Sequence, residues 1–115
     1  MAWDDYYVIA YQILLYLYGQ LKRGEDIKAE YLKPNSPLFK KPLNQRYWNY
    51  IMRNLYKQGY ITGLTVDENI DHAVLIYNLE DTEITPAGIE YLCDNSFLKK
   101  VRAFIKETKE VVPFI

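Results

Sequence analysis

The sequence predicts an α+β fold that is mainly helical and forms a single domain over residues 1–115. Three observations lead to this class. Apolar residues recur at helical spacing through the first half of the chain, two β-rich runs surround a turn in the middle, and a capped helical pattern begins at Thr85. A helix, a two-stranded hairpin and a further helix in this order are typical of a winged helix-turn-helix, here with an N-terminal helix and an extra C-terminal helix.

The first predicted helix begins after Asp4-Asp5, which can cap it, and ends at Lys22-Arg23-Gly24. Two apolar stripes follow its length, so the helix is apolar nearly all round and we expect burial on more than one side. A domain of this size has few other elements to bury the second side of the helix, so a second copy of the chain could cover it. This predicts a homodimer. The side chains expected at that interface are Tyr7, Tyr11, Leu14 and Tyr18.

Tyrosine is the most over-represented residue, with 12 of 115 positions. Its ring buries apolar area while its hydroxyl stays polar. Two interpretations therefore stay open: the tyrosines line the margin of a small core, or they form an interface between subunits.

A short second helix is predicted over residues 25–33, and a loop follows over residues 33–43, where Pro34, Pro37 and Pro42 interrupt the chain. Helix-turn-helix units normally join their helices with three or four residues, so a connection of about eleven departs from the pattern. It predicts either a loosened unit or a functional insertion.

The next predicted helix, over residues 45–58, carries two different faces between its N-cap Asn44 and Gly59. The face for the core comprises Trp48, Ile51, Met52 and Leu55. The opposite face has no acid and presents the hydrogen-bond donors Arg46, Asn49, Tyr50, Arg53 and Lys57. Arginine pairs with guanine edges or phosphates, asparagine with adenine edges and tyrosine with phosphates. This division predicts a helix that reads double-stranded DNA, with Lys40 and Lys41 on phosphates; a solvated face of an ordinary surface helix is the alternative.

The hairpin is predicted from residues 60–66 and 72–79, which are rich in β-branched and aromatic side chains. Its tip carries Asp67, Glu68 and Asp71, which would repel DNA phosphates. These acids support an alternative function, a protein–protein interaction module without DNA binding. In that case the basic helix and the acidic surface would pair with a partner, or with each other between subunits.

Two helices are predicted after the hairpin. Thr85-Pro86 starts the first, and Gly88 lets it approach a neighbour closely. Cys93 is expected on its inner side with Ile89 and Leu92, as a small buried hydrophobe rather than a reactive thiol. Asn95 or Ser96 caps the last helix, whose expected core stripe is Phe97, Val101, Phe104 and Thr108, flanked by Leu98 and Ile105.

Two segments carry a family resemblance: Leu-x-x-x-Gly-Tyr-Ile at residues 55–61, and Ile-Thr-x-x-Gly-x-x-x-Leu at residues 84–92, followed by Asn-Ser-Phe-Leu-Lys-Lys. In these residues the chain resembles the YjcQ-like family of small bacterial and phage winged-helix proteins. The resemblance implies the fold and a bacterial or prophage setting, and it carries over no functional residues. Together with the basic helix, it leads us to expect a phage or host transcription regulator.

The sequence offers little for catalysis. Cys93 and His72 are the only cysteine and histidine, and no pair at metal-ligand spacing and no glycine-rich phosphate loop occurs. We therefore expect no enzyme activity, no metal and no cofactor. The N-terminus is acidic rather than basic, and the mostly apolar run 6–18 is shorter than the about 20 residues that span a bilayer. With a lone cysteine, these features predict a soluble cytoplasmic protein.

Overall fold

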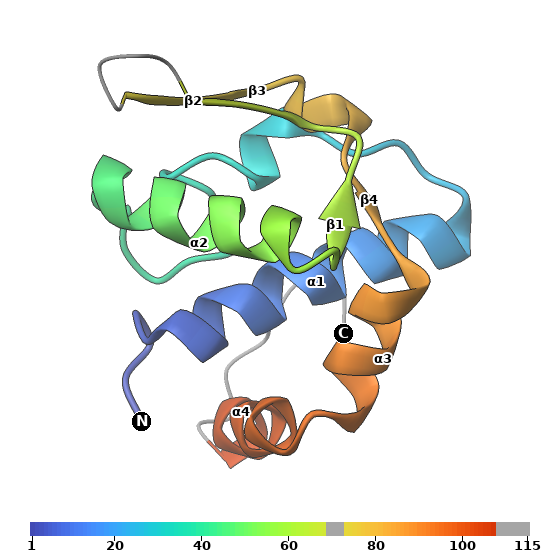
Figure 1. Cartoon of the computed structure of the whole chain (residues 1–115). Helices are drawn as coiled ribbons and strands as arrows, with labels where there is room; N and C mark the ends of the chain where they lie inside the picture. Colours follow the sequence, from blue (N-terminus) through green and yellow to red (C-terminus); the bar gives the residue numbers. More distant parts are fainter. Residues whose placement is uncertain (69–72, 108–115) are drawn as a thin grey trace.

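The computed structural model describes residues 1–68 and 73–107. In chain order its elements are α1 (Tyr6–Arg23), the 3-10 turn η1 (Ala29–Tyr31), α2 (Gln45–Lys57), β1 (Ile61–Thr62), β2 (Thr65–Glu68), β3 (Val74–Tyr77), the 3-10 turn η2 (Leu79–Asp81), β4 (Glu83–Ile84), α3 (Pro86–Asp94) and α4 (Ser96–Glu107) (Figure 1). The fold is α+β and mainly helical, as predicted, and it is compatible with a winged-helix-like arrangement.

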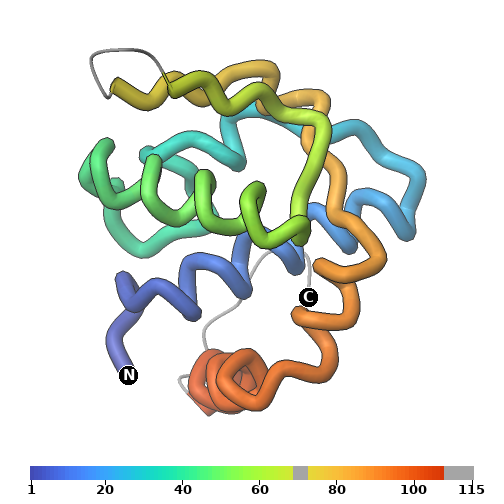
Figure 2. The backbone as a smooth tube through the Cα atoms, viewed as in Figure 1, coloured from blue at the N-terminus to red at the C-terminus, as the bar shows by residue number. Residues whose placement is uncertain are grey.

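Helix α1 runs through the middle of the molecule and contacts α2, α3, α4 and β4 (Figures 1 and 2). Its buried side chains lie nearly all round the helix: Val8, Ile9, Ala10, Tyr11, Gln12, Ile13, Leu14, Tyr16, Leu17 and Gln20. Burial on more than one side is confirmed, but the chain's own α3 and α4 provide the cover. The expectation that Tyr11 and Leu14 lie at a dimer interface is therefore wrong, because both are in the core of a single chain.

The segment between α1 and α2 differs from the prediction, since the helix expected over residues 25–33 is reduced to η1. Side chains of the two flanking helices bind backbone groups of this segment. The hydroxyl of Tyr16 accepts a hydrogen bond from the Lys28 backbone N–H at 2.9 Å, and Trp48 Nε1 donates to the Leu32 carbonyl at 2.9 Å. The rest is a loop with the prolines, as predicted, and the predicted second helix is reduced to a single turn.

Side chains at the predicted N-cap positions begin three of the helices. Asn44 caps α2, Thr85 caps α3 and Asn95 caps α4, each by accepting hydrogen bonds from backbone N–H groups of the first turn. Asp5 holds the same position before α1, but its carboxylate accepts a hydrogen bond from the Ala2 backbone N–H instead of one from the helix.

The strands form two antiparallel pairs. Strands β2 and β3 pair from Thr65↔Tyr77 to Glu68↔Val74 and form a hairpin that lies along α2 (Figure 1). The hairpin is confirmed, but its first strand begins at Thr65 and not at residue 60, and Asp67 and Glu68, which were predicted at the tip, belong to β2. Strands β1 and β4 pair as Ile61↔Ile84 and Thr62↔Glu83, and they join the end of α2 to the start of α3. Asp71 and His72 lie outside the described residues.

The core stripe of α4 is shifted by one residue from the prediction. Leu98, Val101 and Ile105 are buried at spacings of three and four, whereas Phe97 is 51% exposed and Phe104 is half-buried. Successive helical residues are about 100° apart, so a stripe that starts at Leu98 turns Phe97 outward. Thr108, also expected in the stripe, lies outside the described residues.

Cys93 on α3 is exposed, which corrects the expectation that it is buried. Gly88 and Leu92, four residues apart, form the side of α3 that faces the core, and Cys93 is one residue beyond that side. A Cβ at Gly88 would lie 2.2 Å from the Tyr60 carbonyl oxygen, so this helix packs directly on the backbone of the chain after α2.

Candidate nucleic-acid interface

Helix α2 presents its hydrogen-bond donors at the surface. Its apolar face, Trp48, Ile51, Met52 and Leu55, is buried as predicted. Of the predicted DNA-contacting residues on α2, Arg46, Tyr50 and Lys57 are exposed, and Asn49 and Arg53 are partly exposed. The two faces that the sequence pattern indicated are therefore present on one helix.

The predicted phosphate contacts Lys40 and Lys41 are exposed on the loop before α2. Lys40 Nζ lies 4.8 Å from the centroid of the Trp3 ring, a cation–π distance. Both lysines line a surface hollow of about 480 Å³ together with Asp4 and Tyr47. This loop therefore places basic side chains at the N-terminal end of α2, next to the N-terminal segment.

That N-terminal segment also brings carboxylates to α2. The Tyr47 hydroxyl donates a hydrogen bond to the Asp4 carbonyl at 2.6 Å. Burial raises the pKa of Tyr47, and the negative charges of Asp4 and Asp5 raise that pKa further. The N-terminal end of α2 therefore lies in the field of two acids that sequence spacing did not connect with it.

A third acid lies at the other end of the basic face. Glu68 Oε1, on β2, is 3.6 Å from Arg53 Nη1 and 3.5 Å from Lys57 Nζ. One carboxylate thus faces two cations, which leaves a local excess of one positive charge. All three side chains are substantially exposed, and exposed ion pairs contribute only about 0–1 kcal/mol each. The acidic hairpin and the basic helix therefore pair within one chain, whereas the sequence predicted such pairing only with a partner or between subunits.

Beside the basic side chains of α2 lies a groove of about 360 Å³. Its lining comes from α1, α2 and α3, and we call it the tyrosine groove: Tyr6, Tyr7, Tyr47, Tyr50, Asn54, Gln58 and Tyr91. The rings contact each other, with the Tyr6 and Tyr50 centroids 6.0 Å apart in an edge arrangement. Beside the groove, Tyr60 stacks on Tyr91 at 4.2 Å.

Burial is the main cause that raises the pKa of Tyr6 and of Tyr91 to about 12, and the neighbouring tyrosines add to each shift. Both phenols therefore keep their proton to a higher pH than an exposed tyrosine does. Sequence reasoning missed this groove because its tyrosines come from three helices. The high tyrosine content was the available signal, and it did not indicate where the tyrosines would meet.

Few groups of the described residues offer other chemistry. Cys93 is exposed on α3, and its only candidate base, His72, is not among these residues. Within residues 1–68 and 73–107, no group of three His, Cys, Asp or Glu side chains could hold a metal ion. Over the same ranges, no helix has both the length and the apolar character that crossing a membrane requires.

A family model described as "YjcQ protein" matches residues 11–111. The chain belongs to the YjcQ family. This match confirms the resemblance carried by residues 55–61 and 84–92, and it extends the family assignment over most of α1. Comparisons with curated proteins and with solved structures found no match.

Proposed function

We propose that this YjcQ-family protein binds double-stranded DNA through α2. The observation that carries the proposal is the row of donors Arg46, Asn49, Tyr50, Arg53 and Lys57 along the surface of a helix whose opposite face is anchored in the core. Such a helix can enter a major groove and offer donors to base edges and phosphates. Lys40 and Lys41, on the loop before the helix, add contacts to the DNA backbone.

The hairpin takes a different role from the basic wing of many winged helices. Asp67 and Glu68 repel phosphate, so we expect no contact between the described part of the hairpin and the DNA backbone. Phosphate would instead compete with Glu68 for Arg53 and Lys57. Because these ion pairs are exposed and weak, this exchange costs little. We therefore expect binding through the helix and the loop alone, with modest affinity and a marked dependence on salt.

The test is a titration of random-sequence duplex with the wild type and with Arg53→Ala/Lys57→Ala. Losing two phosphate contacts should weaken binding and reduce the slope of log K against log salt by about 2. The matched control, Lys99→Ala/Lys106→Ala, removes the same charge from α4 and should bind like the wild type. If both variants lose affinity equally, binding depends on total charge and the assignment to α2 fails.

A second candidate function is protein recognition without DNA binding. The tyrosine groove favours it, because Tyr7 and Tyr50 of its lining are exposed and aromatic side chains are enriched at protein interfaces. A homodimer is one form of this function, and of the residues predicted for it only Tyr7 and Tyr18 are not buried in the core. Light scattering at tens of micromolar, with the wild type and Tyr7→Ser/Tyr50→Ser, tests the homodimer. A dimer that only the wild type forms would place Tyr7 and Tyr50 in a protein interface and remove Tyr50 from the residues proposed to contact DNA.

A further inference from the structure

A larger groove, of about 1040 Å³, lies between α1, α3 and α4. Apolar side chains of all three helices line it, among them Leu15 from α1, Leu92 from α3 and Leu98 from α4. Ligand pockets for small molecules usually measure about 300–1,000 Å³, so this groove is at the upper limit for one small ligand. Its size and its apolar lining indicate a more extended ligand.

Cationic side chains lie along two sides of this groove, and among the described residues no carboxylate lines it. Lys22 and Arg23 come from α1, and Lys99, Arg102 and Lys106 come from α4. The three α4 cations follow spacings of three and four, so they lie on one side of the helix over about two turns, or roughly 10 Å. The positive charge is thus distributed along the groove instead of being collected at one end.

The α4 cations are available to a ligand. Among the described residues, no carboxylate forms an ion pair with Lys99, Arg102 or Lys106. On α1, the ammonium of Lys22 lies 5.0 Å from the ring centroid of Tyr18, which orients it without neutralising its charge.

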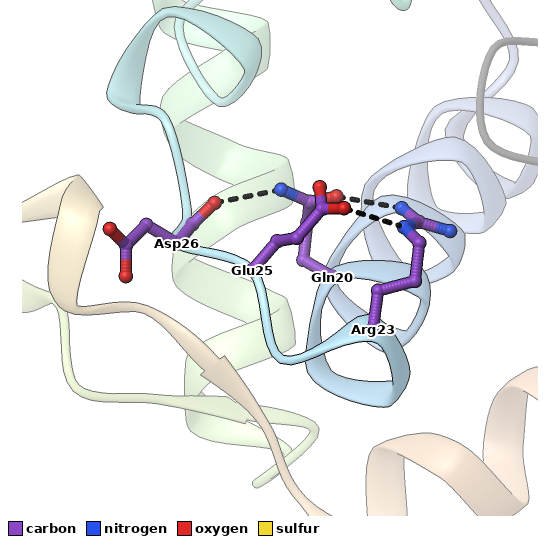
Figure 3. Close-up of polar contacts among 4 residues, drawn as sticks. All are labelled: Gln20, Arg23, Glu25 and Asp26. Atoms are coloured by element: carbon purple, nitrogen blue, oxygen red, sulfur yellow. Dashed lines mark hydrogen bonds and ion pairs between the residues drawn. The ribbon is translucent and has the colours of Figure 1, made fainter.

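Arg23, at the end of α1, is held in position by its neighbours. It donates a hydrogen bond to Gln20 Oε1 at 2.6 Å, and its Nε lies 3.8 Å from Glu25 (Figure 3). Gln20 in turn donates to the Asp26 carbonyl at 2.7 Å. These contacts orient Arg23 at this end of the groove, and Glu25 offsets part of its charge, so the uncompensated cations are mainly those of α4.

We propose that the groove binds an acidic amphipathic helix of a partner protein. Such a helix places an apolar stripe on an apolar floor, and acids on both edges of the stripe would meet the cations of α1 and α4. A fatty acid has a single carboxylate and would use the cations at one end only. The chain's own exposed acids Glu80, Asp81 and Glu83 lie on a 3-10 turn and a two-residue strand, so a second copy offers no matching helix there.

This inference goes beyond DNA binding and does not depend on it, because the groove and the donor face of α2 share no residue. A failure of one proposal therefore leaves the other intact. Arg53→Ala/Lys57→Ala, which tests DNA binding, should bind the acidic helix like the wild type.

Cys93 makes the groove directly testable. It is the only cysteine of the chain, it is exposed, and it lines the groove. The probe is a fluorescein-labelled peptide of about 16 residues with leucine at i, i+3, i+4 and i+7 and glutamate on both edges of that stripe. Binding is measured by fluorescence polarisation, and occupancy of the groove by the rate at which a thiol reagent modifies Cys93.

We expect the peptide to bind and to slow the modification of Cys93 several-fold. Lys99→Glu/Arg102→Glu should weaken binding by at least about tenfold, because two attractions become repulsions. The matched control Lys28→Glu/Lys33→Glu reverses two exposed charges outside the groove and should keep the wild-type affinity. Ala103→Trp keeps every charge but fills the groove, so it should also weaken binding.

Three results would overturn the proposal. The peptide does not bind, it binds without protecting Cys93, or a peptide of the same composition in scrambled order binds equally well. Protection of Cys93 by dodecanoate but not by the peptide would assign the groove to a fatty-acid-like ligand. Protection that rises with protein concentration alone would assign it to a second copy of the chain.

Discussion

Glu68 Oε1 of β2 lies 3.6 Å from Arg53 Nη1 of α2, and it joins the acidic hairpin to the basic helix within one chain. The same oxygen is 3.5 Å from Lys57 Nζ. The proposed DNA-binding face therefore carries its own competitor for phosphate. The contact makes the charge of Glu68, as well as the cations of α2, a determinant of affinity for DNA.

Glu68→Gln should strengthen binding to random duplex. The substitution keeps the shape of the side chain and removes the negative charge that competes with phosphate, so affinity should rise by several-fold at low salt. Glu83→Gln, which removes an exposed acid from β4, is the matched control and should have little effect. An equal gain in both variants would show that only net charge matters. No gain for Glu68→Gln would show that Glu68 does not compete with phosphate for Arg53 and Lys57.

Gly88→Ala should destabilise the fold, because its Cβ would lie 2.2 Å from the Tyr60 carbonyl oxygen and force α3 away from the backbone. Overpacking of this kind costs about 1–3 kcal/mol. At Gly19 the nearest atoms to a Cβ would be those of the Arg23 guanidinium, at 3.1 Å, which is an exposed side-chain end and not backbone. Alanine gains about 0.5–1 kcal/mol over glycine within a helix. Urea denaturation should therefore show opposite shifts for Gly88→Ala and Gly19→Ala, and equal shifts would contradict the packing of α3.

Trp48→Phe should lower the free energy of unfolding by about 1–3 kcal/mol, because the Leu32 carbonyl loses its buried hydrogen bond from Nε1. Trp3→Phe is the comparison, since Trp3 is only partly buried and packs on Phe104 at the surface. Thermal or urea denaturation measures both. If Trp3→Phe lowers the free energy of unfolding as much as Trp48→Phe does, the hydrogen bond to Leu32 does not anchor the loop.

Alkaline pH should destabilise the protein between pH 10 and about 12. Burial raises the pKa of Tyr6 and of Tyr91 from 10 to about 12, so in this window the unfolded chain releases protons that the folded chain retains. The unfolded state then binds fewer protons, and the free energy of unfolding falls as pH rises. Melting temperatures followed across this range should decline less steeply for Tyr6→Phe/Tyr91→Phe. The same decline in the variant would exclude these two phenols as its cause.

Local patterns predicted the local structure well. The caps Asn44, Thr85 and Asn95 could be predicted from their residue type and their position before an apolar run. The buried face of α2 could be predicted from the spacing of its apolar residues. The predictions for Phe97 and Cys93 were wrong by one residue, that is, by about 100° around a helix. On short helices with apolar residues on several sides, spacing does not decide between neighbouring stripes.

Tertiary contacts could not be predicted in the same way. The sequence showed a face of α2 without acids, but Glu68 comes from a strand and Asp4 from the N-terminus. The sequence pattern favoured a dimer interface at Tyr11 and Leu14. In the structure both residues are buried within one chain, where α3 and α4 cover α1. The tyrosine groove and the groove beside α4 likewise combine residues that are far apart along the chain.

The measurement that tests the central claim most directly is the binding of random-sequence duplex at about 20 mM and about 150 mM salt. If Arg46, Arg53, Lys57 and the two loop lysines contact phosphates, log K should fall with log salt with a slope of about −4.5. Binding that appears at low salt and falls in this way is the predicted result. No binding at low salt would contradict DNA recognition by α2 and assign that face to a protein partner.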